Sequence, residues 1–238
     1  LFRSLFRSIG YTYFKLENIE NAIKYSYLAK EKFNQINSKN EYANSLLLLA
    51  DGYNKKGDIK NAIKYSKVTL KVFKEINNLT YVSEIENNLG RLFYEFENME
   101  ESFIHLNKAK EIRQNTKDLK LIDTLANICE NYIKLKSVSK AKEALKHILD
   151  YIEDGNNKAL FQYYLLKYRV DLLEDNKNEA ENTLLQALRF VKEQDKLKEA
   201  AEISIMIGKF YVDGGRSIDA AKYLNEGVEL FKKLGVIK

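Results

Sequence analysis

The 238-residue sequence has no proline, no tryptophan, one cysteine and two histidines. Sandwiches and barrels need many turns rich in proline and glycine, so the absence of proline beside only ten glycines argues against both. A single cysteine excludes an internal disulfide framework and a multi-cysteine zinc site. His105 and His147 are too few and too far apart in sequence for a histidine metal cage. We therefore expect no metal and no other cofactor.

Long apolar runs are also missing. No stretch of about 18 apolar residues could span a membrane, and the first residues have no signal-peptide pattern. The net charge is only +5, concentrated in residues 1–80, and so weak a positive charge does not by itself indicate nucleic-acid binding. The sequence predicts a helix-rich cytoplasmic protein that does not contact membranes.

A repeat of about 40 residues is the strongest pattern present. In most copies a small residue is followed three positions later by an aromatic one, as in Gly10 and Tyr13. Two further small residues follow in most copies. The first anchors are Gly10, Ala50, Gly90, Cys129, Tyr168 and Gly208; the second are Ala22, Ala62, Ser102, Ala141, Ala180 and Ala220; the third are Ala29, Thr69, Ala109, Ile148, Ala187 and Gly227.

Small residues at fixed spacing have a packing reason, because a side chain larger than alanine pushes two crossing helices apart. Apolar residues around the anchors recur at the helical period. Each copy therefore predicts a helix, a short turn and a second helix, with longer polar links between copies, such as 37–40 and 154–157. The predicted fold is one all-α domain, 1–238, with repeats at 1–38, 39–78, 79–117, 118–156, 157–195 and 196–238.

These anchors resemble the tetratricopeptide repeat, in which small residues, an aromatic and an alanine stand at equivalent positions. The resemblance implies a right-handed superhelical solenoid of six helix pairs. The sequence departs from the family in its longer period, since the family repeat has about 34 residues. It also lacks the closing proline, and its fifth copy has Tyr168 and Asp171 at the first small and aromatic positions.

Longer helices of this kind resemble the peptide-pheromone-responsive regulators of Gram-positive bacteria (the Rap, Rgg, NprR, PlcR and PrgX group). That resemblance implies quorum sensing through a short secreted peptide bound in the concave groove of the array. Most members of the group bind DNA through an N-terminal helix-turn-helix. None is visible here and residue 1 falls inside the first expected helix, so we expect a missing upstream domain through which any DNA contact is made. A homodimer is left open.

Positions 2, 5, 9 and 12 of each copy are expected to form a row along the groove. In the first two copies this row includes Arg7, Tyr11, Leu47 and Asp51. Asparagine both donates to and accepts from a peptide backbone, while apolar neighbours take alternate side chains. The predicted peptide-binding residues are Asn54, Asn87, Asn88, Arg91, Tyr94, Asn127, Glu130 and Arg169.

Within that set, Arg91 and Arg169 are candidates to pair with a peptide carboxylate. The alternative is that all of these are ordinary solvated helix residues in an asparagine-rich chain.

A stripe of lysines on one expected helix has two readings. The spacing of 4, 3, 4 and 3 puts five lysines on one helix face, where they could contact phosphates or an acidic partner or simply keep an outer face solvated. These lysines are Lys60, Lys64, Lys67, Lys71 and Lys74. Cys129 replaces a glycine or alanine anchor and is expected to be a buried, inert thiol.

No arrangement of residues points to catalysis, so an enzyme is not expected. The sequence predicts the ligand-sensing, protein-interaction domain of a bacterial transcriptional regulator. Two alternatives are a general scaffold that binds a protein partner, and a response-regulator antagonist of the phosphatase type.

Overall fold

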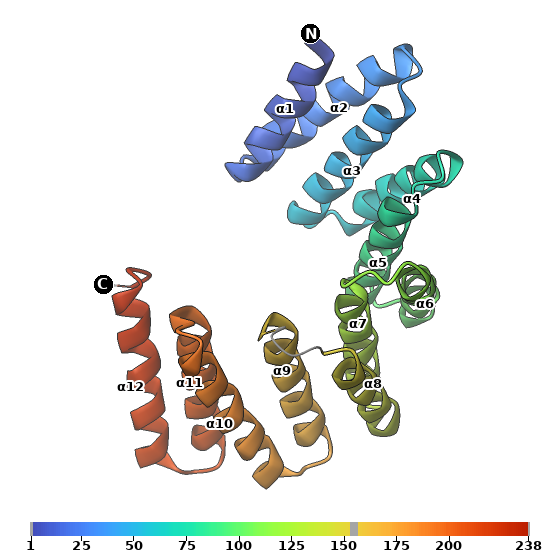
Figure 1. Ribbon diagram of the computed structural model, residues 1–238. Coiled ribbons are helices and arrows are strands. Elements are labelled where there is room, and N and C mark those ends of the chain that lie inside the picture. The colour runs from blue at the N-terminus through green and yellow to red at the C-terminus, as the bar shows by residue number, and fades with distance from the viewer. Residues whose placement is uncertain (1, 153–156, 238) are drawn as a thin grey trace. The chain divides into compact units, whose positions relative to one another are not determined.

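The computed structural model describes residues 2–152 and 157–237, which form twelve helices and, within those two ranges, no strand (Figure 1). The helices are α1 (Phe2–Lys15), α2 (Ile19–Gln35), α3 (Lys39–Lys55), α4 (Ile59–Glu75), α5 (Leu79–Glu95), α6 (Met99–Asn115), α7 (Leu121–Lys134), α8 (Val138–Asp150), α9 (Asn157–Leu173), α10 (Lys177–Glu193), α11 (Leu197–Asp213) and α12 (Ser217–Lys233). The predicted all-α helical-repeat fold is confirmed.

Two compact units make up the chain, Leu1–Asn127 and Ile128–Lys238. The first contains α1 to α6 and the beginning of α7, and the second contains the remainder. Every helix pair lies within one of the six ranges expected from the repeat. A single continuous array over both units stays a prediction. None of the described helices is long and apolar enough to cross a membrane.

The turns explain the length of the repeat. Residues with positive φ recur in the turns at 17, 37, 57, 77, 97 and 117 in the first unit and at 136, 175, 195 and 215 in the second. At the end of α1, the N–H of Glu17 donates to the carbonyl of Phe14 and that of Asn18 to Tyr13, at 3.2 and 2.9 Å. This left-handed cap satisfies the last carbonyls of the helix. Asn18 then begins α2 by accepting from the N–H of Asn21.

A 17-residue helix followed by this three-residue turn therefore repeats every 20 residues through α2 to α5. The expectation of a longer polar link at 37–40 was wrong, because Lys39 already begins α3. The link expected at 154–157 falls largely outside the described residues. Compared with the family repeat of about 34 residues, each helix gains close to one turn of about 3.6 residues.

The left-handed turn residues give a first prediction. Lys136 is exposed and has φ 54°, a conformation that costs a residue with a Cβ more than it costs glycine. We expect Lys136→Gly to raise the free energy of unfolding by about 0.5–1 kcal/mol, after the larger entropy of glycine in the unfolded chain is subtracted. Gly57→Ala, at φ 81° with open space around it, is the mirror control and should destabilise. Urea denaturation measures both, and a destabilised Lys136→Gly would contradict this reading of the turn.

Small residues mark the helix crossings, as the sequence predicted. All three sets of anchors are buried except Tyr168, which is half-buried. A Cβ built on Gly90 would lie 2.5 Å from Cγ of Leu106, and one on Gly208 would lie 2.6 Å from Cγ of Leu224. At these two crossings a Cβ on the glycine would clash with the facing leucine.

We expect Gly90→Ala to lower the free energy of unfolding by about 1–3 kcal/mol through overpacking, although alanine is the better helix former. In a protein that already carries Leu106→Ala, the further change Gly90→Ala should cost nothing, since the clash needs both side chains. Thermal unfolding of the two single variants and the double variant measures this coupling. Additive effects would show that the two helices do not meet at Gly90.

Two aromatic rings pack against each other in most helix pairs, and the sequence pattern showed only the first of the two. Tyr13 stacks on Tyr25, with centroids 5.4 Å apart and planes at 13°. Tyr53–Tyr65 and Phe93–His105 stack in the same way, while the rings of Tyr211 and Tyr223 lie 5.6 Å apart with their planes tilted by 55°. The second ring stands twelve residues after the first. The first helix of a pair therefore carries one ring, the second helix carries the other, and the two rings pack against each other.

The fifth pair, α9 and α10, replaces this stack by a polar network. Lys167, at the position of the buried Leu89, donates to Asp171 at 3.0 Å, to Thr183 at 2.9 Å and to Glu179 at 2.6 Å. Thr183 also donates to Asp171 at 2.8 Å, and Asp171 is only 5% exposed. The fifth copy therefore departs from the family pattern because Asp171 and Thr183 stand where other copies have the two rings, and these two residues bond to each other and to Lys167.

Candidate functional site

A pocket of about 450 Å³ opens on the first unit where α1, α3 and α5 approach one another. On α1 and on α3 the lining residues stand three or four positions apart, so each helix presents one face to it. They are Arg7, Ser8, Tyr11, Thr12, Asn44, Leu47, Leu48, Asp51 and Tyr81. The α2 and α4 helices contribute nothing to this lining.

The pocket contains one carboxyl group, that of Asp51, whose ionisation is disfavoured by burial. Burial, together with the nearby Glu84 carboxylate, raises the pKa of Asp51 to about 6. Arg7 lines the same pocket. The site therefore offers one carboxylate whose negative charge is poorly solvated and one guanidinium, and a cation arriving beside Asp51 would favour its ionised form.

The raised pKa predicts how Asp51 affects stability. Below about pH 3 Asp51 is protonated in the folded and the unfolded chain alike, so it costs nothing. Between its usual pKa of 3.8 and about 6 the folded state progressively loses stability, and the cost is complete above that range. Asp51→Asn should therefore raise the free energy of unfolding at pH 7.5 by on the order of 2 kcal/mol, and by almost nothing at about pH 3.

Urea denaturation at the two pH values measures this, with Asp213→Asn, at an exposed site in the last turn of α11, as the matched control. An Asp51→Asn variant no more stable than the parent at pH 7.5 would contradict the assigned burial.

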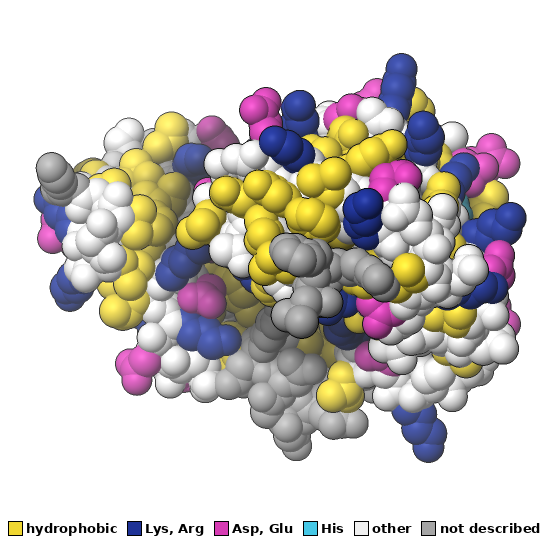
Figure 2. Space-filling view, turned by 90° about the horizontal axis from the view of Figure 1, so that it is seen from above, with side chains coloured by type: hydrophobic (Ala, Val, Ile, Leu, Met, Phe, Trp, Pro, Cys, Tyr) yellow, Lys and Arg dark blue, Asp and Glu magenta, His cyan; other side chains and the backbone are white. Residues whose placement is uncertain are grey.

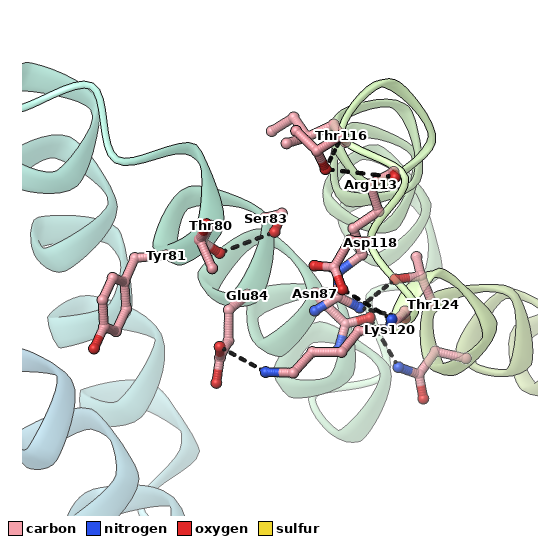
Figure 3. A network of polar contacts seen from close by, with 12 residues as sticks. Thr80, Tyr81, Ser83, Glu84, Asn87, Arg113, Thr116, Asp118, Lys120 and Thr124 are labelled. Atoms are coloured by element: carbon pink, nitrogen blue, oxygen red, sulfur yellow. Dashed lines mark hydrogen bonds and ion pairs between the residues drawn. The ribbon is translucent and has the colours of Figure 1, made fainter.

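Beside the pocket, a polar network joins α5 to α7 and to the link between α6 and α7 (Figure 3). Asn87 is 7% exposed, and its Oδ1 accepts from Nδ2 of Asn127 at 3.0 Å. Glu84 pairs with Lys120 at 3.1 Å. Arg113 donates to the carbonyl of Lys120 at 2.9 Å and to the Thr124 hydroxyl at 2.6 Å. The network fixes the segment that leads into α7.

The predicted site residues fall into separate groups. Asn87 and Asn127 are brought together, while Asn88 is half-buried on α5. Glu130 and Arg169, both in the second unit, form an ion pair with each other, so the structure gives Arg169 a carboxylate of its own chain. Asn54 and Arg91 are exposed and Tyr94 is half-buried; these three line no part of the described pocket.

None of the residues that line the pocket was in the predicted site. The helical row contained Arg7, Tyr11, Leu47 and Asp51, which was the available signal, but nothing about their residue types set them apart. Asn44 and Tyr81 carried no signal beyond their position on the first helix of a copy.

Cys129 and the histidines do not form a reactive centre. Cys129 is fully buried, and burial raises the pKa of its thiol to about 12, so almost no thiolate exists near neutral pH. His105 is buried on Phe93 and Glu86. Among the residues that the structure describes, no group of three His, Cys, Asp or Glu side chains could hold a metal ion.

Comparison with known proteins agrees with this architecture. Residues 8–31 match the tetratricopeptide-repeat family model, and no curated protein matches the chain. Among solved structures the chain is similar to the apo form of RapI, with a TM-score of 0.73 and 16% identity over 99% of this chain and 85% of RapI.

Two further structures are similar over less of their own length. The apo form of the quorum sensor NprR from B. thuringiensis has a TM-score of 0.76 and 16% identity, over 96% of this chain and 65% of that one. The Rap conjugation gene regulator of the plasmid pLS20, solved with the Phr* peptide, has a TM-score of 0.62 and 15% identity, over 98% of this chain and 63% of that one. The chain thus spans less than two thirds of these two proteins. At such identities the similarity establishes a shared fold.

Proposed function

We propose that this chain, whose fold is that of the tetratricopeptide-repeat regulators, binds a short signalling peptide on the face formed by the odd-numbered helices of its first unit. The observation that carries the proposal is the pocket between α1, α3 and α5. Its volume of about 450 Å³ lies within the range of about 300–1,000 Å³ typical of small-ligand sites. It combines Leu47 and Leu48 with Asn44, Asp51 and Arg7, the mixture that an extended peptide requires.

Two groups of side chains have distinct roles in this proposal. Asn44 bonds the peptide backbone, Asp51 takes a positively charged group, and Arg7 takes a carboxylate in place of Arg91 and Arg169. Asn87 and Asn127 exchange their mutual hydrogen bond for bonds to the peptide where it passes from α5 to α7. Asn88, Asn54 and Tyr94 belong to the same proposed surface, whereas Glu130 lies in the second unit and pairs with Arg169 there.

That exchange suggests how binding is sensed. The Asn87–Asn127 bond joins α5 to α7, so a peptide that replaces it alters the packing of neighbouring repeats, and each repeat contacts only its neighbours. We propose that the chain is the sensing domain of a cytoplasmic bacterial transcriptional regulator, that peptide binding shifts its conformational population, and that DNA is contacted only through another domain. The similarity in fold to NprR and to a peptide-bound Rap regulator supports this role.

Binding to synthetic peptides tests the proposal. A library of labelled hexapeptides is screened by fluorescence polarisation, and the tightest binder is then titrated by calorimetry into the parent and into single variants. Asn44→Ala, Asn87→Ala and Asn127→Ala should each weaken binding about tenfold, which corresponds to about 1.4 kcal/mol. Asn107→Ala, at an exposed asparagine of α6, is the matched control and should bind as the parent does. Equal affinity of all four variants would contradict the site.

A phosphatase-type antagonist of a response regulator is the second candidate, because one similar structure is an aspartyl phosphate phosphatase from Bacillus subtilis, of which the chain spans 59%. That activity would need a catalytic side chain from another domain. Dephosphorylation of a response regulator by the full-length protein, abolished by the peptide, would favour it over DNA binding.

A further inference from the structure

The α4 helix carries a charge pattern unlike that of the other even-numbered helices. It has five lysines and one glutamate, a net charge of +4. In the other five even-numbered helices the basic and acidic residues are equal in number or differ by one. On the face of the molecule shown in Figure 2 both signs are likewise interspersed. A high overall lysine content therefore does not account for α4.

All five lysines are exposed, and the structure neutralises few of them. Lys74 pairs with Glu86 at 2.8 Å, and the ammonium of Lys67 lies 5.1 Å from the centroid of the Phe93 ring. Among the described residues, no carboxylate pairs with Lys60, Lys64 or Lys71. Like charges three and four positions apart repel one another along a helix, and an acidic partner would relieve that repulsion.

An open cleft of about 490 Å³ lies within this stripe and is lined by Lys67, Leu70, Lys71, Lys74 and Glu75. Most of its surface is apolar, because Leu70 forms part of the wall and the lysines contribute their methylene stems. The stripe is therefore more than a row of charges. It has room for an apolar side chain flanked by carboxylates.

We propose that α4 is a docking surface for an acidic amphipathic segment of a partner protein, which seats an apolar side chain in the cleft and places carboxylates on the lysine stripe. This surface goes beyond the proposed peptide site, to which α4 contributes no lining residue. A nucleic acid would satisfy the charges but has no apolar side chain for the cleft, so the observations favour a protein segment.

Fluorescence polarisation with designed probes tests the proposal. The first probe is a labelled helical peptide of about 15 residues that repeats glutamates at the spacing of the stripe with leucines beside them. The second has serine in place of each leucine, and the third is a short DNA duplex. The leucine peptide should bind at least tenfold more tightly than either of the others. Lys71→Glu should weaken it at least tenfold, and Lys67→Glu with Lys71→Glu further still.

Two controls keep the outcome decisive. Lys108→Glu, at an exposed lysine of α6, changes the net charge by the same amount and should leave binding within twofold of the parent. Lys71→Glu alone retains the contact between Lys67 and Phe93, so a loss of binding by that variant with an unchanged melting temperature reports on docking. Equal binding of the serine peptide, stronger binding of the duplex, or no effect of Lys71→Glu would each overturn the proposal. None of these results bears on the hexapeptide titration.

Discussion

Replacing Lys167 with leucine is expected to lower the free energy of unfolding by about 3 kcal/mol, although leucine is the residue found at this position in two other repeats. Lys167 is bonded to Asp171, Glu179 and Thr183. Without its ammonium, Asp171 is left as a buried charge whose remaining bond comes from Thr183. Breaking a buried pair costs about 3–5 kcal/mol, and the surviving bond places this case at the lower end.

Restoring the ring stack should reverse the loss. In Lys167→Leu combined with Asp171→Tyr and Thr183→Tyr, α9 and α10 carry the residues that close the second helix pair. We expect the triple variant to unfold with at least the free energy of the parent, because well-packed apolar residues often replace a buried ion pair without cost. Asp171→Tyr alone should destabilise, because Lys167 then loses its buried carboxylate partner.

Urea denaturation, with hydrogen exchange to locate the change, measures both effects. Exchange should quicken in α9 and α10 of the single variant and remain slow in α3 and α4, which belong to a repeat that does not neighbour this pair along the chain, since repeats are stabilised mainly by their neighbours. A Lys167→Leu variant as stable as the parent would contradict the assigned network, and so would a triple variant less stable than the single one.

Glu86→Ala is expected to cost about 3–5 kcal/mol. Glu86 is 1% exposed and bonds His105 at 2.6 Å and Lys74 at 2.8 Å. Its removal leaves His105 buried without this carboxylate and opens a cavity. Glu84→Ala, two residues earlier on α5, is the matched control and should cost less than about 1 kcal/mol, since its pair with Lys120 is largely exposed.

The effect of Glu86 should depend on pH. Burial alone would raise the pKa of this carboxyl, but hydrogen bonds from His105 and Lys74 outweigh burial and hold it below the usual 4.5. Its contribution is therefore present above about pH 4.5 and is lost as the pH falls through the lower pKa of the folded state. Urea denaturation at pH 7 and pH 3 should show the gap between parent and Glu86→Ala narrowing in acid. A gap of the same size at both pH values would contradict the assigned bonds.

The helical repeat was predictable from the sequence because its cause is local and recurrent. Gly90, Ala62 and most of their equivalents are small, buried residues where helices cross. The uniform turn was less evident, since Lys136 and Asp175 occupy left-handed positions that a sequence usually signals by glycine. The 20-residue period is a property of backbone geometry more than of residue type.

The buried charges and the pocket could not be predicted in the same way. Glu86 and Lys167 stand where most other copies have apolar residues, and apart from Asp171 their partners lie 12 to 19 positions away on the neighbouring helices. The pocket depends on how closely side chains of α1 and α3 approach, which no repeat pattern encodes. The hydrogen bond between Asn87 and Asn127, which were predicted as peptide-binding residues, was not foreseen either.

Photo-crosslinking of a bound peptide tests the central claim most directly. A hexapeptide selected by its binding is resynthesised with a photoreactive phenylalanine at each position in turn, irradiated with the protein and mapped by mass spectrometry. The account predicts crosslinks to the walls of the pocket on α1, α3 and α5, including Tyr11, Leu47 or Tyr81, and their loss when unlabelled peptide competes. Crosslinks confined to the even-numbered helices, including α4, would contradict it.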